Sequence, residues 1–253
     1  MPDESISGTR RRTALITGGT RNIGRAAALA LAGDGIQVVV VSRHLDADAQ
    51  TTLDALAQCG SEGIHIAADV SDEMAVQQMF AAAAEYFGGI DIMVHCAAVR
   101  RVRPIADMSL AEWREVMAIN LDAAFLCSKA VLPHFPAHGG RIVYFSGVSA
   151  FFGVADRAHV IASKAGVVGL ARALATELGA RGITVNCISP GTIETARGPN
   201  AGALPHAVNE LPIPLERRGT VDEVAAVLRM LVSDGGAYVT GQVIHVNGGL
   251  YFG

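Results

Sequence analysis

Charged side chains are scarce in this 253-residue chain, since Asp, Glu, Lys and Arg together make up only 17% of it. The formal net charge of −4 provides no global positive field, which argues against binding to nucleic acid or to an anionic membrane. A short basic cluster at Arg100, Arg101 and Arg103 is at most a local contact. We therefore expect a small-molecule substrate as the partner, with no nucleic acid and no membrane.

Cysteine and long apolar runs are also in short supply. The four cysteines lie far apart in apolar runs, without C-x-x-C or metal-ligand spacing, so we expect buried reduced thiols and no metal site. No apolar stretch approaches the ~20 residues that span a bilayer. The polar N-terminus MPDESISGTRRR lacks the apolar segment of a secretory signal, and we expect residues 1–11 to form a disordered tail. These absences favour a cytoplasmic protein.

Hydrophobic residues, by contrast, make up 51% of the chain, and their pattern is regular. From Arg12 onward, β-branched runs alternate with amphipathic Ala/Leu segments, which is typical of successive βαβ units. The fold class is therefore predicted to be α/β, a doubly wound Rossmann-type parallel sheet of about seven strands in a single domain over residues 12–253. The predicted strands are Thr13–Thr17, Ile36–Ser42, Ile64–Ala67, Ile90–Cys96, Arg141–Ser146, Ile183–Ser189 and Val243–Val246.

Helix-capping and loop signals between these segments agree with the alternation of strands and helices. Ser109 and Glu112 form a capping box that opens a long helical segment towards Phe135. The stretch 192–219 is rich in proline and glycine and has weak periodicity, so we expect a substrate lid there.

A glycine-rich turn directly follows the first predicted strand. It reads Thr17-Gly18-Gly19-Thr20-Arg21-Asn22-Ile23-Gly24 and runs into a helix. Glycines let the backbone approach a pyrophosphate, and the helix N-terminus supplies free N–H groups and the positive end of a dipole. This position between strand and helix indicates a dinucleotide site.

The turn resembles the T-G-x-x-x-G-x-G loop of the short-chain dehydrogenase/reductase family, with Asn22 at the middle glycine. Asn is the side chain that most often adopts left-handed backbone conformations, so the turn can be kept. The resemblance spans roughly Thr13 to Gly249. It includes Asp69-Val70 as the adenine-contacting pair, Asn120, the loop Pro190-Gly191-Thr192-Ile193 beside the nicotinamide, and Tyr238-Val239-Thr240-Gly241. At His95-Cys96-Ala97-Ala98 the family usually has Asn-Asn-Ala-Gly, so only Ala97 carries over.

The resemblance implies a set of cofactor-binding residues. These are Gly18, Thr20, Arg21, Asn22, Ile23, Gly24, Ser42, Arg43, Asp69, Val70, Ala97, Asn120, Lys164, Pro190, Gly191 and Ile193. An acidic side chain after the second strand would favour NAD, whereas this chain has Ser42 and Arg43 there. Arg43 and Arg21 offer planar donors suited to a phosphate, so NADP(H) is favoured over NAD(H). The alternative is that both arginines are solvated surface residues.

The catalytic pattern of the resembled family is incomplete. Family enzymes carry Y-x-x-x-K on one helix face, with a serine upstream that binds the carbonyl oxygen. Lys164 matches the lysine, but Val160 stands at the tyrosine and Gly147 at the serine. Ser146 could replace that serine only if the strand bulges. His159 could act as a general acid near neutral pH, but it points ~100° away from the Val160 face, which favours a structural or surface role.

The candidate catalytic residues are therefore Asn120, Lys164 and Ser146, and three functions stay open. The first is an atypical NADP(H)-dependent oxidoreductase acting on a small carbonyl or conjugated, enoyl-type substrate, because the run His159–Lys164 resembles the tyrosine-lacking helix of 2,4-dienoyl-CoA reductases. The second is a redox-inactive ligand-binding or interaction protein, and the third is a non-redox step in the same pocket. Family resemblance also implies a homotetramer.

Overall fold

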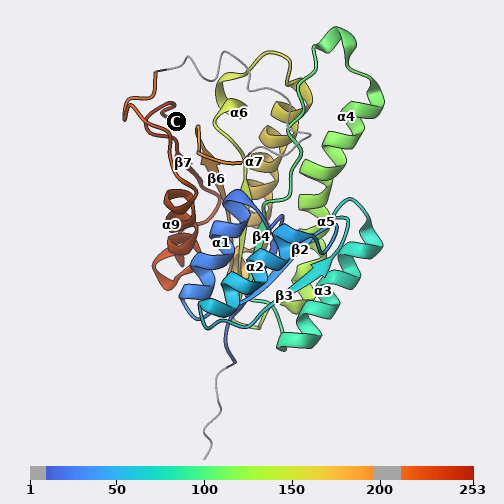
Figure 1. The fold of residues 1–253 in the computed structure, drawn as a ribbon, viewed down its shortest axis with the longest axis vertical. Coiled ribbons are helices and arrows are strands. Elements are labelled where there is room, and N and C mark those ends of the chain that lie inside the picture. Colours follow the sequence, from blue (N-terminus) through green and yellow to red (C-terminus); the bar gives the residue numbers. More distant parts are fainter. Residues whose placement is uncertain (1–9, 197–211) are drawn as a thin grey trace, which may run out of the picture.

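The computed structural model describes residues 10–196 and 212–253 (Figure 1). Seven parallel strands form one sheet in this described part, in the order β3-β2-β1-β4-β5-β6-β7, which confirms the predicted fold class. The strands are β1 Thr13–Thr17, β2 Gln37–Ser42, β3 Gly63–Ala67, β4 Ile92–His95, β5 Gly140–Phe145, β6 Ile183–Pro190 and β7 Val243–Val246. The helices are α1 Asn22–Gly33, α2 Ala47–Gln58, α3 Glu73–Phe87, α4 Leu110–Met117, α5 Ala123–Val131, α6 Ser149–Phe152, α7 Ala158–Leu178 and α9 Val221–Val232.

Two predicted segments lie largely outside the described residues. Most of the expected tail, residues 1–9, belongs to the part that is not described. So does the middle of the expected substrate lid, residues 197–211. The tail and the lid therefore stay predictions.

The strand order reverses between β1 and β4, which places the site. The chain adds β2 and β3 on one side of β1 and then crosses to β4 on its other side, where Thr17 pairs with His95. Ligands of doubly wound sheets bind at the carboxyl ends of the strands, beside such a switch point. The loops that follow β1 and β4 therefore lie side by side at the expected site.

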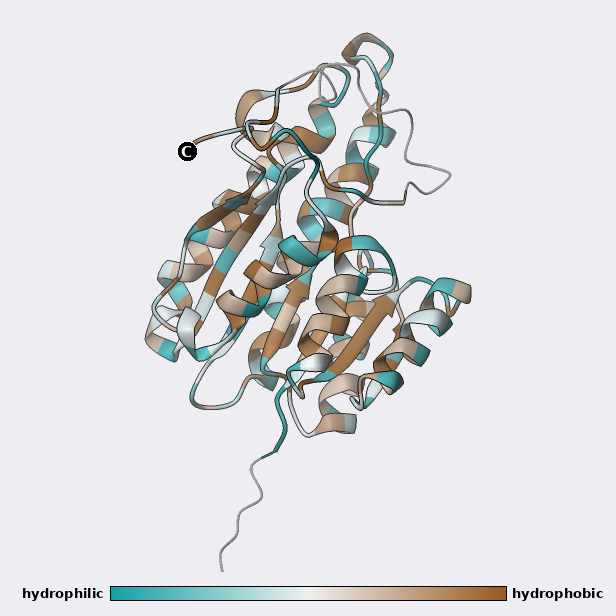
Figure 2. Cartoon of the chain, turned by 60° about the vertical axis from the view of Figure 1, so that its left-hand side comes forward, coloured by the Kyte–Doolittle hydropathy of each residue, from teal (hydrophilic) through white to brown (hydrophobic). Residues whose placement is uncertain are grey.

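Helices cover both faces of the sheet and divide the core into two hydrophobic clusters (Figures 1 and 2). Successive side chains of a strand point to opposite faces, so Leu15 belongs to the cluster packed by α3, α5 and α7. Its neighbours Ala14 and Ile16 belong to the cluster packed by α1 and α9. Both faces of β1 are thus buried, as parallel sheets require.

The long segment that begins at Ser109 is not one regular helix. The predicted capping box is present, because Ser109 Oγ accepts from the Glu112 amide and the Glu112 carboxylate accepts from the Ser109 amide. After α4, however, residues Ala118–Asp122 form a π-helix before α5 begins. Such a bulge marks a functional or strained position, and it carries Asn120.

Two helical stretches also correct the expectation about membrane spans. Leu110–His134 and Ala158–Arg181 are each long and apolar enough to cross a membrane by length and composition alone. Both pack on the sheet, where Cys127 and Val167 are buried in the same hydrophobic cluster. Their apolar faces therefore serve, at least in part, as core.

Candidate active site

The glycine-rich turn after β1 is shaped by close backbone contacts. Gly18 has φ +65°, and a Cβ added to it would lie 2.8 Å from the Ala97 amide nitrogen. A Cβ on Gly24 would lie 2.0 Å from the Gly18 carbonyl oxygen. Asn22 adopts φ +49°, so the left-handed conformation predicted for it is confirmed. The loops of β1 and β4 thus meet without room for side chains.

The N-terminus of α1 opens beside this turn. Its N-cap residue, Arg21, has extended backbone and makes no side-chain capping bond within the described residues. The side chain of the N-cap residue therefore accepts no hydrogen bond from the first-turn N–H groups. Together with the helix dipole they suit a phosphate group.

The turn after β2 is held by a hydroxyl–imidazole contact. Ser42 Oγ donates to the His44 carbonyl oxygen at 2.8 Å and also lies 2.8 Å from His65 Nε2. A hydroxyl has one proton, and a carbonyl can only accept, so the imidazole donates to Ser42. The Ser42 proton is used within the turn, so Arg43 is the residue of this pair whose side chain could still donate to a phosphate.

Arg43 lies near Asp69, the acidic residue expected at the adenine end. Hydrogen bonds from the Ser71 hydroxyl and amide hold the pKa of Asp69 below its usual value, and the charge of Arg43 lowers it further. Arg21 forms an ion pair with Asp48, with Nε 3.4 Å from the carboxylate. Both partners are more than half exposed, so a phosphate could compete for Arg21.

His95 is a structural residue at the end of β4. Its Nδ1 lies 3.0 Å from Thr17 Oγ1, which also accepts from the Ala97 amide at 3.3 Å. Burial, with the nearby charge of Lys164, lowers the pKa of His95 to about 3. It therefore stays neutral and joins β1 to β4.

Asn120 ties the loop after β4 to α7. Its Oδ1 accepts from the Val99 amide at 2.8 Å, and its Nδ2 donates to the Val99 carbonyl at 3.1 Å and to Ser163 Oγ at 3.0 Å. The side chain is fully buried. These contacts match the role of a residue that satisfies backbone groups at a helix irregularity.

Lys164 is buried one turn after Val160. Its Nζ donates to the Phe145 carbonyl at 2.7 Å. Burial, with the charge of Arg100, lowers the pKa of Lys164 to about 8. The amine is thus held at the carboxyl end of β5, on the side of the site where the family lysine is expected.

Ser146 and Gly147 lie at the end of β5, where the resembled family has its serine. Ser146 Oγ donates to the Lys164 carbonyl at 3.3 Å, and its amide continues the ladder to Ile188 at 2.9 Å. The strand does not bulge here, so the condition under which Ser146 would replace the family serine is not met. A Cβ added to Gly147 would have open space around it. A side chain added at Gly147 would therefore meet no steric obstacle from the described residues.

Val160 and His159 lie on different sides of α7. Val160 is 4% exposed but belongs to neither of the two hydrophobic clusters in the described residues. His159 is fully buried, and burial lowers its pKa. The charges that act on it come from Glu112, Arg157 and Arg101, whereas Lys164 faces Arg100 and two thiols. The prediction that His159 is structural agrees with this separation.

The loop after β6 completes the site, and its Thr192, which the resemblance places beside the nicotinamide, was not among the predicted cofactor-binding residues. A Cβ on Gly191 would lie 2.7 Å from Asn247 Cα, so the loop packs closely there. The Thr192 hydroxyl is buried and has no hydrogen-bond partner within the described residues. An unpaired buried hydroxyl is costly and fits a ligand amide or carbonyl. Its place directly after Pro190-Gly191 was the available signal.

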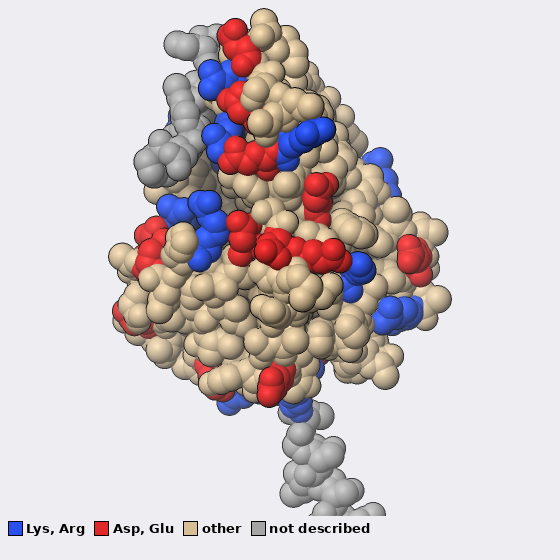
Figure 3. Space-filling model, turned by 90° about the vertical axis from the view of Figure 1, so that its right-hand side faces the viewer, with Lys and Arg blue, Asp and Glu red and all other residues tan. Residues whose placement is uncertain are grey.

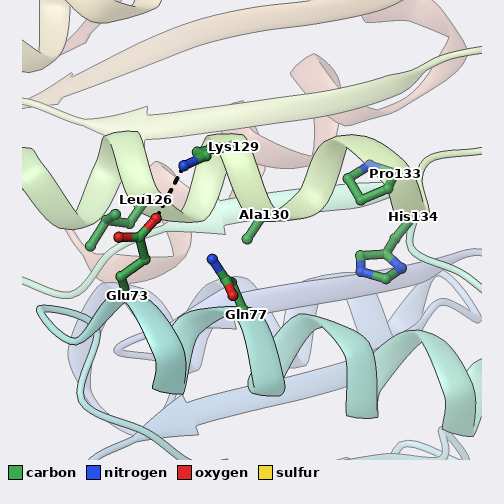
Figure 4. Close-up of a pocket in the computed structure, with 7 residues that line it drawn as sticks. All are labelled: Glu73, Gln77, Leu126, Lys129, Ala130, Pro133 and His134. Carbon is green, nitrogen blue, oxygen red and sulfur yellow. Dashed lines mark hydrogen bonds and ion pairs between the residues drawn. The ribbon is translucent and has the colours of Figure 1, made fainter.

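A separate hollow and the surface charges do not define another site. The hollow holds about 240 Å³ between α3 and α5, and none of the predicted site residues lines it (Figure 4). Glu73 and Lys129 form an ion pair across it at 3.1 Å. On the face shown in Figure 3, basic side chains are interspersed with acidic ones.

Comparisons with known proteins agree with this geometry. The family model described as Enoyl-(Acyl carrier protein) reductase matches residues 18–251. A 3-oxoacyl-[acyl-carrier-protein] reductase of Synechocystis sp. is 37% identical over 94% of this chain and 96% of its own length. Solved structures are also similar to the chain. A blue fluorescent protein from a metagenomic library, in complex with NADPH, has a TM-score of 0.88 at 31% identity and covers 95% of this chain and 98% of its own. A short-chain dehydrogenase from Burkholderia cenocepacia, in complex with NADP, has a TM-score of 0.87 at 32% identity and covers 94% and 97%. The chain therefore belongs to the short-chain dehydrogenase/reductase family of oxidoreductases.

Proposed function

We propose that this chain is an NADP(H)-dependent oxidoreductase that reduces a conjugated, enoyl-type substrate without a tyrosine acid. The observation that carries the proposal is the state of α7. Lys164 is kept, buried and anchored to the Phe145 carbonyl, while Val160, one turn earlier, has no proton to give. In this proposal the residues expected to bind the cofactor are kept, and a hydrocarbon side chain stands where the acid is expected.

The residues present fit a dinucleotide. The glycine turn and the uncapped start of α1 would hold the pyrophosphate, Arg43 a 2′-phosphate, and the Thr192 hydroxyl a polar group of the nicotinamide end. The NADPH and NADP complexes of the similar structures support the same preference. When bound, NADPH supplies a hydride.

The chain's own residues suit an acceptor whose oxygen needs charge stabilisation rather than protonation. Lys164 brings an ammonium into a desolvated site, where a positive charge stabilises a developing enolate more than it would in water. Val160 offers only apolar contact, so the carbon proton would come from another donor, such as water. A thioester substrate agrees with the names of the matching family model and of the Synechocystis relative.

The proposal is tested by titrating the protein with NADPH, followed by fluorescence. Ketones, 3-oxoacyl thioesters and enoyl or dienoyl thioesters are then offered while absorbance of the reduced nicotinamide is recorded. We expect oxidation of NADPH with the conjugated thioesters and little with ketones. Binding without oxidation on any acceptor would leave the second function, a redox-inactive NADPH-binding or interaction protein. The departures at Val160, Gly147 and His95 favour that alternative.

A non-redox step would show as substrate turnover without any change in NADPH.

We further propose a homotetramer located in the cytoplasm. Large apolar side chains such as Phe125 (51% exposed) and Tyr238 (fully exposed) support subunit contacts. The four free cysteines agree with a reducing compartment. Mass photometry at several protein concentrations tests the assembly, and a persistent monomer would contradict it.

A further inference from the structure

A short strap of backbone follows β6 and runs from the loop before α9 to the start of α1. We define the strap as residues 192–196. One of its ends is fixed to Gly219, whose amide donates to the Thr192 carbonyl at 3.0 Å and whose carbonyl accepts from the Glu194 amide at 2.8 Å. The same residues form an isolated bridge between Ile193 and Gly219. The strap is thus anchored on the side of α9.

The other end of the strap is fastened by Asn22. The Asn22 amide Nδ2 donates to the Ala196 carbonyl at 3.0 Å, and Oδ1 accepts from the Ala196 amide at 2.8 Å. Both polar groups of one side chain are therefore used on one backbone residue, 174 positions away. A glycine here would adopt φ +49° equally well but could make neither bond.

The fastening point lies at the cofactor cradle. Asn22 is the first residue of α1 and follows the N-cap residue Arg21, whose side chain makes no capping bond within the described residues. Because its side-chain amide is engaged with Ala196, that group is not available to a phosphate, and the first-turn N–H groups keep that role. The strap also carries Thr192, whose hydroxyl is buried without a partner in the described residues. The strap therefore connects the phosphate end of the cradle with the loop after β6.

We propose that Asn22 is a positioning residue that fastens the strap over the cofactor cradle and so slows the exchange of NADP(H). The inference rests on the proposed function, since it needs a bound dinucleotide. The departure of Asn22 from the family glycine then adds a contact that the glycine cannot make. If the strap is fastened equally strongly in the free and the cofactor-bound protein, loss of the fastening speeds association and dissociation of the cofactor by the same factor. The equilibrium affinity for the cofactor then stays almost unchanged.

The test compares Asn22→Gly with Asp156→Gly. Both wild-type residues have positive φ, +49° and +62°, so both variants relieve the same kind of backbone strain. Only Asn22→Gly removes the two bonds to Ala196. Dissociation of NADPH is measured by stopped-flow fluorescence with excess competitor, and the equilibrium Kd by titration.

We expect Asn22→Gly to release NADPH about tenfold faster, which corresponds to ~1.4 kcal/mol, with a Kd within about twofold of wild type, and Asp156→Gly to behave as wild type. Two net hydrogen bonds at an exposed site account for this size. An unchanged dissociation rate overturns the inference. So does a Kd that weakens in proportion to the dissociation rate, since Asn22 would then bind the cofactor rather than fasten the strap.

Failure of the proposed function gives a different result. Wild-type protein that binds no NADPH overturns both the function and the role in exchange. Normal NADPH binding with an unchanged dissociation rate in Asn22→Gly overturns only the inference. Hydrogen exchange of a peptide covering residues 192–196 adds a readout in the nucleotide-free protein, where we expect faster exchange in Asn22→Gly than in Asp156→Gly.

Discussion

Restoring the two missing polar groups should convert this chain into a ketone reductase. The perturbation is Val160→Tyr, which adds a phenol one turn before Lys164, combined with Gly147→Ser, which adds a hydroxyl. The structure supports the pair because a Cβ at Gly147 has open space and Val160 lies outside both hydrophobic clusters. Ser146 cannot supply the second group, since its hydroxyl is bonded to the Lys164 carbonyl.

The size of the effect follows from what each group contributes. A positioned proton donor is worth about 10²- to 10⁴-fold in rate, and a donor to the developing oxyanion about 10²- to 10³-fold. The phenol would also need a lowered pKa, which the buried Lys164 can provide when it is charged. Because such groups act as a unit, we expect each single variant to gain less than tenfold and the double variant to gain about 10³-fold.

The assay is NADPH oxidation with a 3-oxoacyl thioester or a simple ketone, with wild type and both single variants alongside. Placing a tyrosine at a site that is 4% exposed costs about 1–3 kcal/mol in packing, so thermal unfolding and NADPH titration must first show a folded, cofactor-binding protein. A folded double variant that binds NADPH and still fails to reduce ketones would refute the argument that these two groups are what is missing.

Three further predictions concern cofactor choice and the structural residues of the site. Arg43→Asp should weaken NADPH binding at least tenfold more than NADH binding in fluorescence titrations, because a charge-assisted contact to phosphate is lost; equal losses would contradict the preference. His95 is neutral in the folded protein, with a pKa of about 3, but titrates near 6.5 when unfolded, so stability is lost as pH falls below 6.5, by about 2 kcal/mol at pH 5. In urea unfolding at pH 7 and pH 5, His95→Asn should lack that loss, and an equal loss in both proteins would refute it. Asn120→Ala should lower the free energy of unfolding by about 2–4 kcal/mol, since it strands both polar groups of Val99; a change below about 1 kcal/mol in urea unfolding would count against this role.

The architecture was predictable because it depends on local periodicity and on rules for parallel sheets. Predicted strand boundaries differ from the observed ones by at most two residues, as at Ile90, which precedes the observed start of β4 at Ile92. The sequence pattern predicts that β2 begins at Ile36, whereas the strand begins at Gln37 although Ile36 is buried. A residue that is only buried and a residue that also pairs with the neighbouring strand give similar sequence patterns. The exact end of a strand therefore cannot be predicted from the pattern alone.

The site was predictable where residues follow directly after strands or match a motif of the resembled family. The glycine turn and Gly191 follow strands β1 and β6, whereas Lys164 lies within α7 and was identified by its motif. The contacts between Asn22 and Ala196, and between Ser42 and His65, join residues that are 174 and 23 positions apart. The π-helix around Asn120 has no periodic signature, because a single wide turn leaves the flanking helical pattern nearly intact. These features depend on tertiary packing, which a pattern of residue types does not contain.

The crowding of the glycine turn has an evolutionary consequence. A side chain at Gly24 would collide with the Gly18 carbonyl, and one at Gly18 with the loop after β4, whether or not a nucleotide is bound. Purifying selection for folding alone would therefore preserve these glycines in a descendant that had abandoned redox chemistry. Among residues 10–196 and 212–253, Arg43 makes no side-chain hydrogen bond or ion pair and the Thr192 hydroxyl has no hydrogen-bond partner, so the persistence of both in close descendants of this chain would record selection for the cofactor itself.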